Sequence, residues 1–119
     1  RKRIKNARLL NSLLDKNSNI RTVKRSKYLK EVYHLYQIQV NERDKLKQFL
    51  IKNNVDAKIH YPTPIHLQPA AKFLKYKRGD FPRAEKIAKT TLSLPVHEFI
   101  GRKEIFYMVS LINQFYRSK

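Results

Sequence analysis

The stretch YHLYQIQVNERDKLKQFLIKNNVDAKIHY, residues 33–61, changes its hydrophobic period twice and thereby decides the fold class. Residues 33–40 alternate between apolar and polar side chains, which predicts a half-buried strand. Its apolar positions are Tyr36, Ile38 and Val40. Residues 55–61 alternate again and predict a second strand, which Pro62 ends because proline cannot donate to a strand ladder.

The residues between these two predicted strands have a helical period. We expect Asn41 to cap this helix, with Asp44 three positions later in a relation like that of a capping box. The pair Asn53-Asn54 provides a stop, because asparagine tolerates the left-handed conformation that ends many helices. The face expected to be buried consists of Leu46, Phe49 and Leu50.

The sequence on either side supplies the remaining elements. In chain order they are a helix at 2–16, an exposed polar connection at 17–27, a short helix opened by Phe81-Pro82, a strand at 91–94 and a helix at 102–117. We therefore predict an α/β fold, of the α+β kind, in which a small three-stranded sheet has helices packed on one face. We expect all 119 residues to form one domain, with residues 1–30 as a linking helix and connection and residues 31–119 as the sheet and helices.

The composition excludes several classes of protein. The chain has no cysteine, so a disulfide framework and a thiolate zinc site are excluded. Its longest nearly apolar run, IFYMVSLI, is far shorter than the ~20 residues of a membrane span, and its first residues do not resemble a signal peptide. The formal net charge is +18, and residues 1–30 carry eleven Lys or Arg against one Asp. Such a charge indicates nucleic acid or another anionic partner, although a basic, solvated surface explains it equally well.

Two basic segments suggest different partners. The sequence KFLKYKR at 72–78 interleaves cations with aromatic rings, as surfaces for single-stranded nucleic acid do. The alternative is that Phe73 and Leu74 pack inward while the lysines are solvated. The sequence RKRIKNARLLNSLL at 1–14 suits either an anionic membrane surface or packing on another domain. A basic cleft also suits a smaller anion, the phosphate of a sugar nucleotide or cofactor, and His60 at the end of the second predicted strand is well placed for it.

The segment HYPTPIHLQPA, residues 60–70, raises the question of a metal site because it holds two histidines. His60 and His66 lie about 19 Å apart if the segment runs as polyproline II at ~3.1 Å per residue. No Cys or acidic cluster nearby completes a set of ligands. Nucleophilic catalysis also lacks support, because no G-x-S-x-G turn exists and Ser93 lies in a predicted strand with no evident base.

Four segments together carry a family resemblance. HYPTPIHLQPA is followed by GDFPRAEKIAKTTLSLPVH, while KNARLLNSLL and VYHLYQIQVNERDKLKQFL lie upstream. In order and spacing they resemble the C-terminal region of the PLP-dependent nucleotide-sugar aminotransferases, the DegT-like family, over essentially the whole chain. The resemblance implies the small domain of a fold-type I aminotransferase. Such enzymes move an amino group from a glutamate-type donor to a keto sugar carried on a nucleotide.

The resemblance also implies a substrate-binding role for four residues. His60 and Tyr61 would face the sugar, His60 through a hydrogen bond to a sugar or phosphate oxygen and Tyr61 through its ring and hydroxyl. The alternation places these two residues on opposite faces of the predicted strand, so the bend at Pro62 has to re-aim one of them. His66 and Gln68 are further substrate-binding candidates, and bracing of the loop is the alternative role for both.

By the same resemblance, pyridoxal 5′-phosphate and its Schiff-base lysine belong to a large domain, so this chain alone is expected to be inactive. The expected partners are that large domain, a nucleotide sugar and a second copy in a cytoplasmic homodimer. Asn54, Ala71 and Glu98 depart from the family pattern at turns and packing positions, which bears on the substrate more than on the fold. The alternative function is a catalytically inactive basic module that binds nucleic acid.

Overall fold

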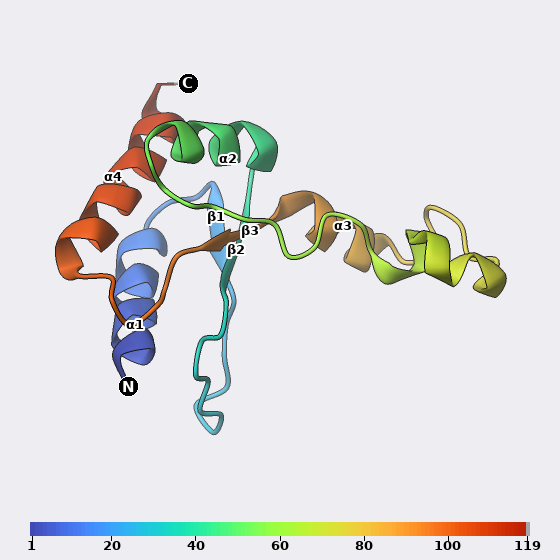
Figure 1. The fold of residues 1–119 in the computed structure, drawn as a ribbon, viewed down its shortest axis with the longest axis horizontal. Coiled ribbons are helices and arrows are strands. Elements are labelled where there is room, and N and C mark those ends of the chain that lie inside the picture. The colour runs from blue at the N-terminus through green and yellow to red at the C-terminus, as the bar shows by residue number, and fades with distance from the viewer. Residues whose placement is uncertain (119) are drawn as a thin grey trace.

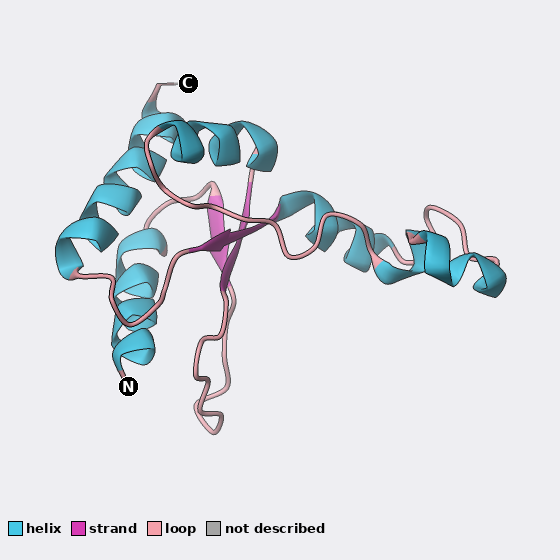
Figure 2. Ribbon diagram, in the orientation of Figure 1, coloured by secondary structure: helices cyan, strands magenta, loops and turns pink. Residues whose placement is uncertain are grey.

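Helices and strands follow one another in an order close to the predicted one (Figures 1 and 2). The computed structural model describes residues 1–118. Its helices are α1 (Lys2–Leu14), α2 (Arg43–Lys52), α3 (Pro82–Thr90) and α4 (Arg102–Arg117), with two short 3₁₀ helices, η1 (Ile65–Leu67) and η2 (Pro69–Leu74). Its strands are β1 (Ile20–Thr22), β2 (Tyr36–Val40) and β3 (Thr91–Leu94). Among the described residues, no helix has the length and apolar character that a membrane crossing requires.

The three strands form one antiparallel sheet in the order β1-β2-β3. Strand β2 lies in the middle, and its Ile38 pairs with Thr22 on one side and with Leu92 on the other. Alternation along β2 buries Tyr36, Ile38 and Val40 and leaves the two glutamines between them half-buried on the opposite face. The predicted α+β fold with a three-stranded sheet is therefore confirmed.

The apolar face of the sheet packs against α1, α2 and α4. Helix α4 contacts both α1 and α2, and Figure 1 shows the three helices gathered on the same side of the sheet. The largest completely buried side chains are Tyr36, Leu10, Leu14, Ile38, Leu46, Leu50, Leu92, Ile105 and Ile112. Burying a Leu or Ile side chain stabilises a fold by about 1.5–3 kcal/mol, so this layer is the main source of stability.

The exposed connection predicted for residues 17–27 is partly wrong, because Ile20–Thr22 form the edge strand β1. Asn17 makes the turn that leads into this strand. Its side-chain oxygen accepts a hydrogen bond from the Asn19 N–H, and its carbonyl accepts one from the Ile20 N–H. Only one residue of β1 is buried, so the strand has no alternation from which it could have been predicted.

The strand predicted at 55–61 is wrong in extent. Within it only Lys58 pairs with β3, exchanging two backbone hydrogen bonds of 3.0 and 2.7 Å with Ser93. The predicted alternation of buried and exposed side chains nevertheless holds over 55–58. The segment therefore follows the outer edge of β3 and brings His60 close to the sheet.

Helix α2 begins without the predicted cap of Asn41 and Asp44. Glu42 adopts a left-handed backbone with φ of 50°, and no side chain caps the first N–H groups of the helix. Asp44 instead accepts a hydrogen bond from Arg43 Nε at 2.7 Å. The predicted stop is confirmed, since Asn54 is left-handed with φ of 61°. The expected buried face is confirmed for Leu46 and Leu50, with Phe49 half-buried.

Residues 61–90, called the arm below, extend away from the helices and sheet (Figure 1). The arm comprises η1, η2 and α3, and α3 runs directly into β3. The chain measures 47 × 38 × 24 Å and has a radius of gyration of 15.6 Å. A compact domain of this length has a radius of gyration of about 13.5 Å, so the arm makes the molecule distinctly elongated.

Candidate functional site

Side chains from strands β2 and β3 hold His60 in place. Its Nδ1 lies 2.8 Å from Ser93 Oγ, and its carbonyl accepts a hydrogen bond from Gln37 Nε2 at 2.7 Å. Ser93 belongs to β3 and Gln37 to β2, and alternation places both on the sheet face opposite the helices. Because Ser93 occupies Nδ1, the other ring nitrogen, Nε2, is the one available to a ligand.

The contact with Ser93 corrects the expectation that this serine has no base beside it. The two residues are 33 positions apart, and the Lys58–Ser93 backbone pair brings them together. Ser93 is only 5% exposed. Among residues 1–118 the hydrogen-bond partners of His60 are a serine and a glutamine rather than the carboxylate that orients the base of a catalytic triad. Ser93 is therefore the residue that fixes the His60 ring.

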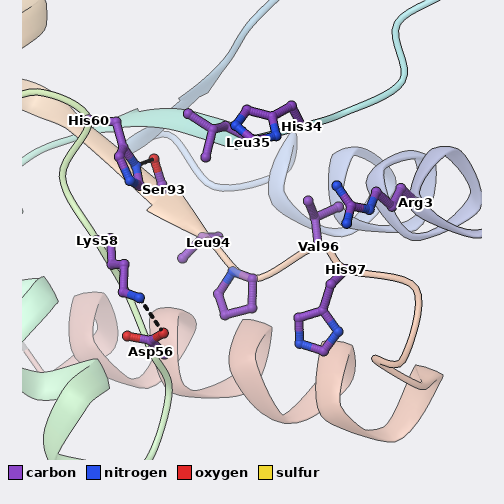
Figure 3. A pocket seen from close by; sticks show the side chains of 11 residues that line it. Arg3, His34, Leu35, Asp56, Lys58, His60, Ser93, Leu94, Val96 and His97 are labelled. Atoms are coloured by element: carbon purple, nitrogen blue, oxygen red, sulfur yellow. Dashed lines mark hydrogen bonds and ion pairs between the residues drawn. The ribbon is translucent and has the colours of Figure 1, made fainter.

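His60 lines a pocket of about 240 Å³ near the end of β3 (Figure 3). Six charged or titratable side chains line it: Arg3, His34, Asp56, Lys58, His60 and His97. They come from α1, from the residue that leads towards β2, from the segment along β3 and from the loop after β3. Sequence reasoning missed this cluster. The available signal was that His34 lies within the strand predicted at 33–40 and that His97 follows the strand predicted at 91–94 by three residues. Within residues 1–118 no three His, Cys, Asp or Glu side chains are grouped closely enough to hold a metal ion.

Two ion pairs hold cations at the edge of this pocket. Arg3 Nε lies 2.9 Å from Glu98 Oε2, and Lys58 Nζ lies 2.9 Å from Asp56 Oδ2. A hydrogen bond from its own backbone N–H, and a second from Arg3, lower the pKa of Glu98. Asn6 adds hydrogen bonds to the carbonyls of His97 and Ile100, which attach α1 to the loop after β3.

Tyr61 follows His60 but lies outside the lining of the pocket. Its side chain is 70% exposed, and its ring meets the His60 ring edge to face at 5.5 Å between centroids. The peptide bond between the two residues is cis. The structure thus brings His60 and Tyr61 into contact and leaves the Tyr61 ring open to solvent.

His66 and Gln68 lie in the arm and bind other parts of it. His66 is buried, with Nε2 3.1 Å from Glu85 Oε1 and its ring 4.8 Å from that of Phe81. Glu85 Oε1 also accepts a hydrogen bond from the Gly79 N–H at 2.7 Å, which is the main reason that the pKa of Glu85 is lowered. Gln68 Nε2 donates to the carbonyl of Thr63. These contacts match the loop-bracing role left open for both residues.

Arg43 is a buried charge that sequence reasoning missed. Its side chain is 8% exposed, and Nη1 donates to the carbonyls of Ala88 and Thr91, both at 3.0 Å. These carbonyls lie at the C-terminal end of α3, where a positive charge is favourable because of the helix dipole. Arg43 therefore connects the start of α2 to the junction between the arm and β3.

Comparison with known proteins gives one consistent result. The model of the DegT/DnrJ/EryC1/StrS aminotransferase family matches residues 1–113. A pleiotropic regulatory protein of Geobacillus stearothermophilus is 42% identical over 86 residues, which are 72% of this chain and 23% of that protein. The dTDP-3-amino-3,4,6-trideoxy-alpha-D-glucose transaminase of Streptomyces venezuelae is 32% identical over 83 residues, which are 70% of this chain and 22% of that enzyme.

The fold is shared with a solved aminotransferase. The crystal structure of S. venezuelae DesV in complex with a ketimine intermediate superimposes with a TM-score of 0.90 and 28% sequence identity, covering 96% of this chain and 31% of that one. The aligned part of the chain spans about a quarter of the length of the curated relatives it matches. The matched family model and the shared fold agree with the resemblance seen in the sequence, and the chain belongs to the DegT/DnrJ/EryC1/StrS aminotransferase family.

Proposed function

We propose that this chain is the C-terminal, substrate-side small domain of a PLP-dependent aminotransferase acting on a nucleotide-linked keto sugar, with a glutamate-type amino donor. The observation that carries the proposal is the His60–Tyr61 pair. Ser93 and Gln37 fix the His60 ring and backbone, so Nε2 is positioned for an oxygen of the sugar nucleotide. The exposed Tyr61 ring beside it offers an apolar face and a hydroxyl.

His66 and Gln68 have a supporting role in this proposal. Both already bind within the arm, His66 to Glu85 and Gln68 to Thr63. They hold the chain that leaves His60–Tyr61 in one conformation. We therefore assign direct substrate contact to His60 and Tyr61 first, with His66 and Gln68 positioning the loop that follows them.

The cofactor belongs to the rest of the enzyme in this proposal. PLP supplies an electron sink when it is bound to an enzyme. A Schiff-base lysine has to lie inside a closed site, whereas the lysines of residues 1–118 are exposed, apart from the half-buried Lys47. The side chains present do not fit the cofactor, and no step of its chemistry is assigned to them.

The arm provides a docking face for the remainder of the enzyme. Its exposed apolar side chains are Tyr61, Ile65, Phe73, Leu74, Tyr76, Phe81 and Ile87. Exposed apolar area of this extent marks an interaction surface, and the matched relatives are about three times as long as this chain. We propose that the arm packs on the large domain of the same enzyme, which forms a homodimer at full length.

The coding sequence upstream of Arg1 tests the proposal. We expect an open frame that encodes a fold-type I large domain with a Schiff-base lysine. The purified full-length protein should then show an internal-aldimine absorbance band with PLP, and replacing that lysine should abolish it. An upstream sequence with no such domain, or a band that persists without the lysine, contradicts the proposal.

One observation favours the nucleic-acid alternative. Inward packing of Phe73 and Leu74 is the alternative to a nucleic-acid surface, yet they are 78% and 47% exposed, and the lysines of the same segment are exposed too. Solvent-facing rings among cations are what single-stranded nucleic acid requires. Tight binding of an oligonucleotide that weakens steeply with salt would support this alternative, whereas weak binding that Phe73→Ala leaves unchanged would oppose it.

A further inference from the structure

Residues 23–35, called the β1–β2 loop below, connect the first two strands and extend away from the sheet (Figures 1 and 2). The loop turns at 26–29, where the Leu29 N–H donates to the Ser26 carbonyl at 3.1 Å. At and beside this turn lie three apolar side chains that face solvent, with Tyr28 84%, Leu29 74% and Val32 67% exposed. Neither the pocket at His60 nor the docking face of the arm includes these three residues, called the tip below.

Arg25 holds the two legs of the β1–β2 loop together. Its Nη1 donates to the Val23 carbonyl at 2.6 Å, and its Nη2 donates to Glu31 Oε1 at 3.1 Å. The guanidinium also lies 4.9 Å from the centroid of the buried Tyr33 ring, which is 6.2 Å from the ring of Tyr36 in β2. The tip is therefore carried on a braced support, and binding through it has to order fewer groups than binding through a free loop.

Positive charge accompanies the tip. Four cations belong to the loop: Lys24, Arg25, Lys27 and Lys30. The carboxylate of the loop, Glu31, is occupied by Arg25. Within residues 1–118 none of the three lysines forms an ion pair, and Lys27 Nζ lies 5.1 Å from the centroid of the Tyr28 ring. The loop thus presents apolar side chains together with uncompensated positive charge.

Two kinds of anionic surface are candidates for this combination, single-stranded nucleic acid and a lipid bilayer with acidic headgroups. Nucleic acid is held by aromatic rings on which its bases stack, whereas the tip has one ring, Tyr28, beside the aliphatic Leu29 and Val32. Tyrosine favours the interface of a membrane. Lysine keeps its charge at the headgroups while its stem covers apolar surface. The composition of the tip therefore fits the bilayer better.

We propose that the β1–β2 loop binds an anionic lipid bilayer, with Tyr28 and Leu29 inserted at the interface and Lys24, Lys27 and Lys30 on the headgroups. Each lysine near an anionic surface strengthens binding about fivefold, which corresponds to ~1 kcal/mol. Such binding is peripheral and reversible. The proposal goes beyond the aminotransferase function and does not depend on it, because the pocket at His60 is lined by other residues.

The test uses the absence of tryptophan from the sequence, because a single tryptophan placed at the tip then reports insertion. Tyr28→Trp is titrated with vesicles of phosphatidylcholine and phosphatidylglycerol in equal amounts, and with vesicles of phosphatidylcholine alone. We expect a blue shift and quenching by brominated lipid with the anionic vesicles, and binding about tenfold or more weaker with the neutral ones. Added salt should weaken the binding because it screens the charges. Ile51→Trp, at an exposed aliphatic position on α2, should show no shift.

Matched variants separate the loop from the general positive charge of the chain. In the Tyr28→Trp protein, Leu29→Ser should weaken binding about tenfold or more, because leucine loses its transfer into an apolar environment. Lys27→Gln should weaken binding about fivefold. Ile51→Ser and Lys52→Gln, at exposed positions on α2, are the controls and should leave binding unchanged. Circular dichroism confirms that each variant is folded.

Four results would overturn the proposal. They are no shift with anionic vesicles, equal binding to neutral vesicles, equal effects of Lys27→Gln and Lys52→Gln, and a stronger response of Tyr28→Trp to a single-stranded oligonucleotide. The last result would assign the loop to nucleic acid. None of the four bears on the aminotransferase proposal, which the upstream coding sequence tests.

A full-length enzyme provides a further check where the upstream frame encodes a large domain. Full-length Tyr28→Trp should bind the anionic vesicles as the chain alone does. A full-length enzyme that does not bind them would show that another part of the enzyme covers the tip, and would also overturn the proposal.

Discussion

The helix-covered sheet and the arm of this chain are stabilised in different ways. The sheet with α1, α2 and α4 surrounds a layer of completely buried aliphatic side chains. The arm buries few, and polar contacts organise it: His66 and Gly79 meet at Glu85, while Arg43 holds its junction with β3. Its apolar side chains face outward. The helix-covered sheet therefore has its own apolar core, whereas the arm leaves most of its large apolar side chains exposed.

The largest expected loss of stability comes from a substitution in the core of the helix-covered sheet. Ile112→Ala removes a completely buried side chain from α4 and should lower the free energy of unfolding by about 2–5 kcal/mol. Urea unfolding followed by circular dichroism measures it. Ser110→Ala, at an exposed position on the same helix, should change stability by less than about 0.5 kcal/mol. Equal effects of the two substitutions would show that the core is not where we place it.

The next effect falls on the junction between the two regions. Arg43→Met leaves the carbonyls of Ala88 and Thr91 without their buried donor and should cost about 1–3 kcal/mol. Amide exchange should accelerate at the end of α3 and in β3. Arg83→Met, exposed on α3, is the matched control. An Arg43→Met protein as stable as this control would mean that the buried contacts do not hold the junction.

A smaller effect tests a polar contact at the rim of the core. The Tyr116 hydroxyl donates to the Asn41 carbonyl at 2.6 Å, and burial raises the pKa of Tyr116 to about 12. Tyr116→Phe should cost about 1 kcal/mol. A raised pKa in the folded state gives a contribution that is complete below pH ~10 and is lost as the pH rises through 12.

Stability measured against pH checks this contribution. The alkaline loss of stability should be smaller in Tyr116→Phe than in the parent chain. Tyr28→Phe, at an exposed tyrosine, should reproduce the parent curve. If Tyr116→Phe follows the parent curve as well, the Tyr116 hydroxyl is not the titrating group.

The smallest expected effect on the stability of the core comes from a substitution in the arm. Glu85→Gln weakens the contact with His66, so amide exchange should accelerate around Gly79 while the urea midpoint of the core stays constant. The pKa of Glu85 is lowered, chiefly by the Gly79 N–H. The stabilisation of the arm is therefore complete above pH ~4.3 and is lost as the pH falls through the lowered value.

Amide exchange as a function of pH gives the measurement. Relative to the intrinsic exchange rate at each pH, the protection of amides in the arm of the parent chain should fall on acidification, whereas Glu85→Gln should remove this step. Lys86→Gln, at the next and exposed position, should retain it. A core that loses stability together with the arm would contradict the separation of the two regions.

Sequence periodicity predicted the elements that bury an apolar stripe. The alternation around Ile38 identified the correct strand and its buried face, and the helix predicted at 102–117 is α4. Sequence reasoning failed in two cases. One is a strand too short to show alternation, and the other is an alternating segment that hardly pairs with a neighbouring strand. Strand β1 buries only Ile20, and the alternating residues 55–61 pair with β3 only at Lys58.

The site was predictable in part. The family resemblance implied a role in substrate binding for His60 and Tyr61; the structure shows that their rings are in contact, and the substrate-binding role stays a prediction. The contact of His60 with Ser93 and the convergence of Arg3, His34 and His97 depend on chain segments far apart in sequence. Such contacts have no local pattern. The position of Phe73 was left open between two alternatives, because a sequence alone does not show whether an apolar residue packs within its own domain or against another.

The measurement that tests the central claim most directly is the kinetics of His60→Ala in the full-length enzyme. We expect the KM for the sugar nucleotide to rise about tenfold or more, while cofactor loading and the reaction with the amino donor stay unchanged. Lys103→Ala, exposed on α4, should behave as the parent enzyme in both half-reactions. A His60→Ala enzyme with an unchanged KM for the sugar nucleotide would contradict the assignment of this chain as the substrate-side domain.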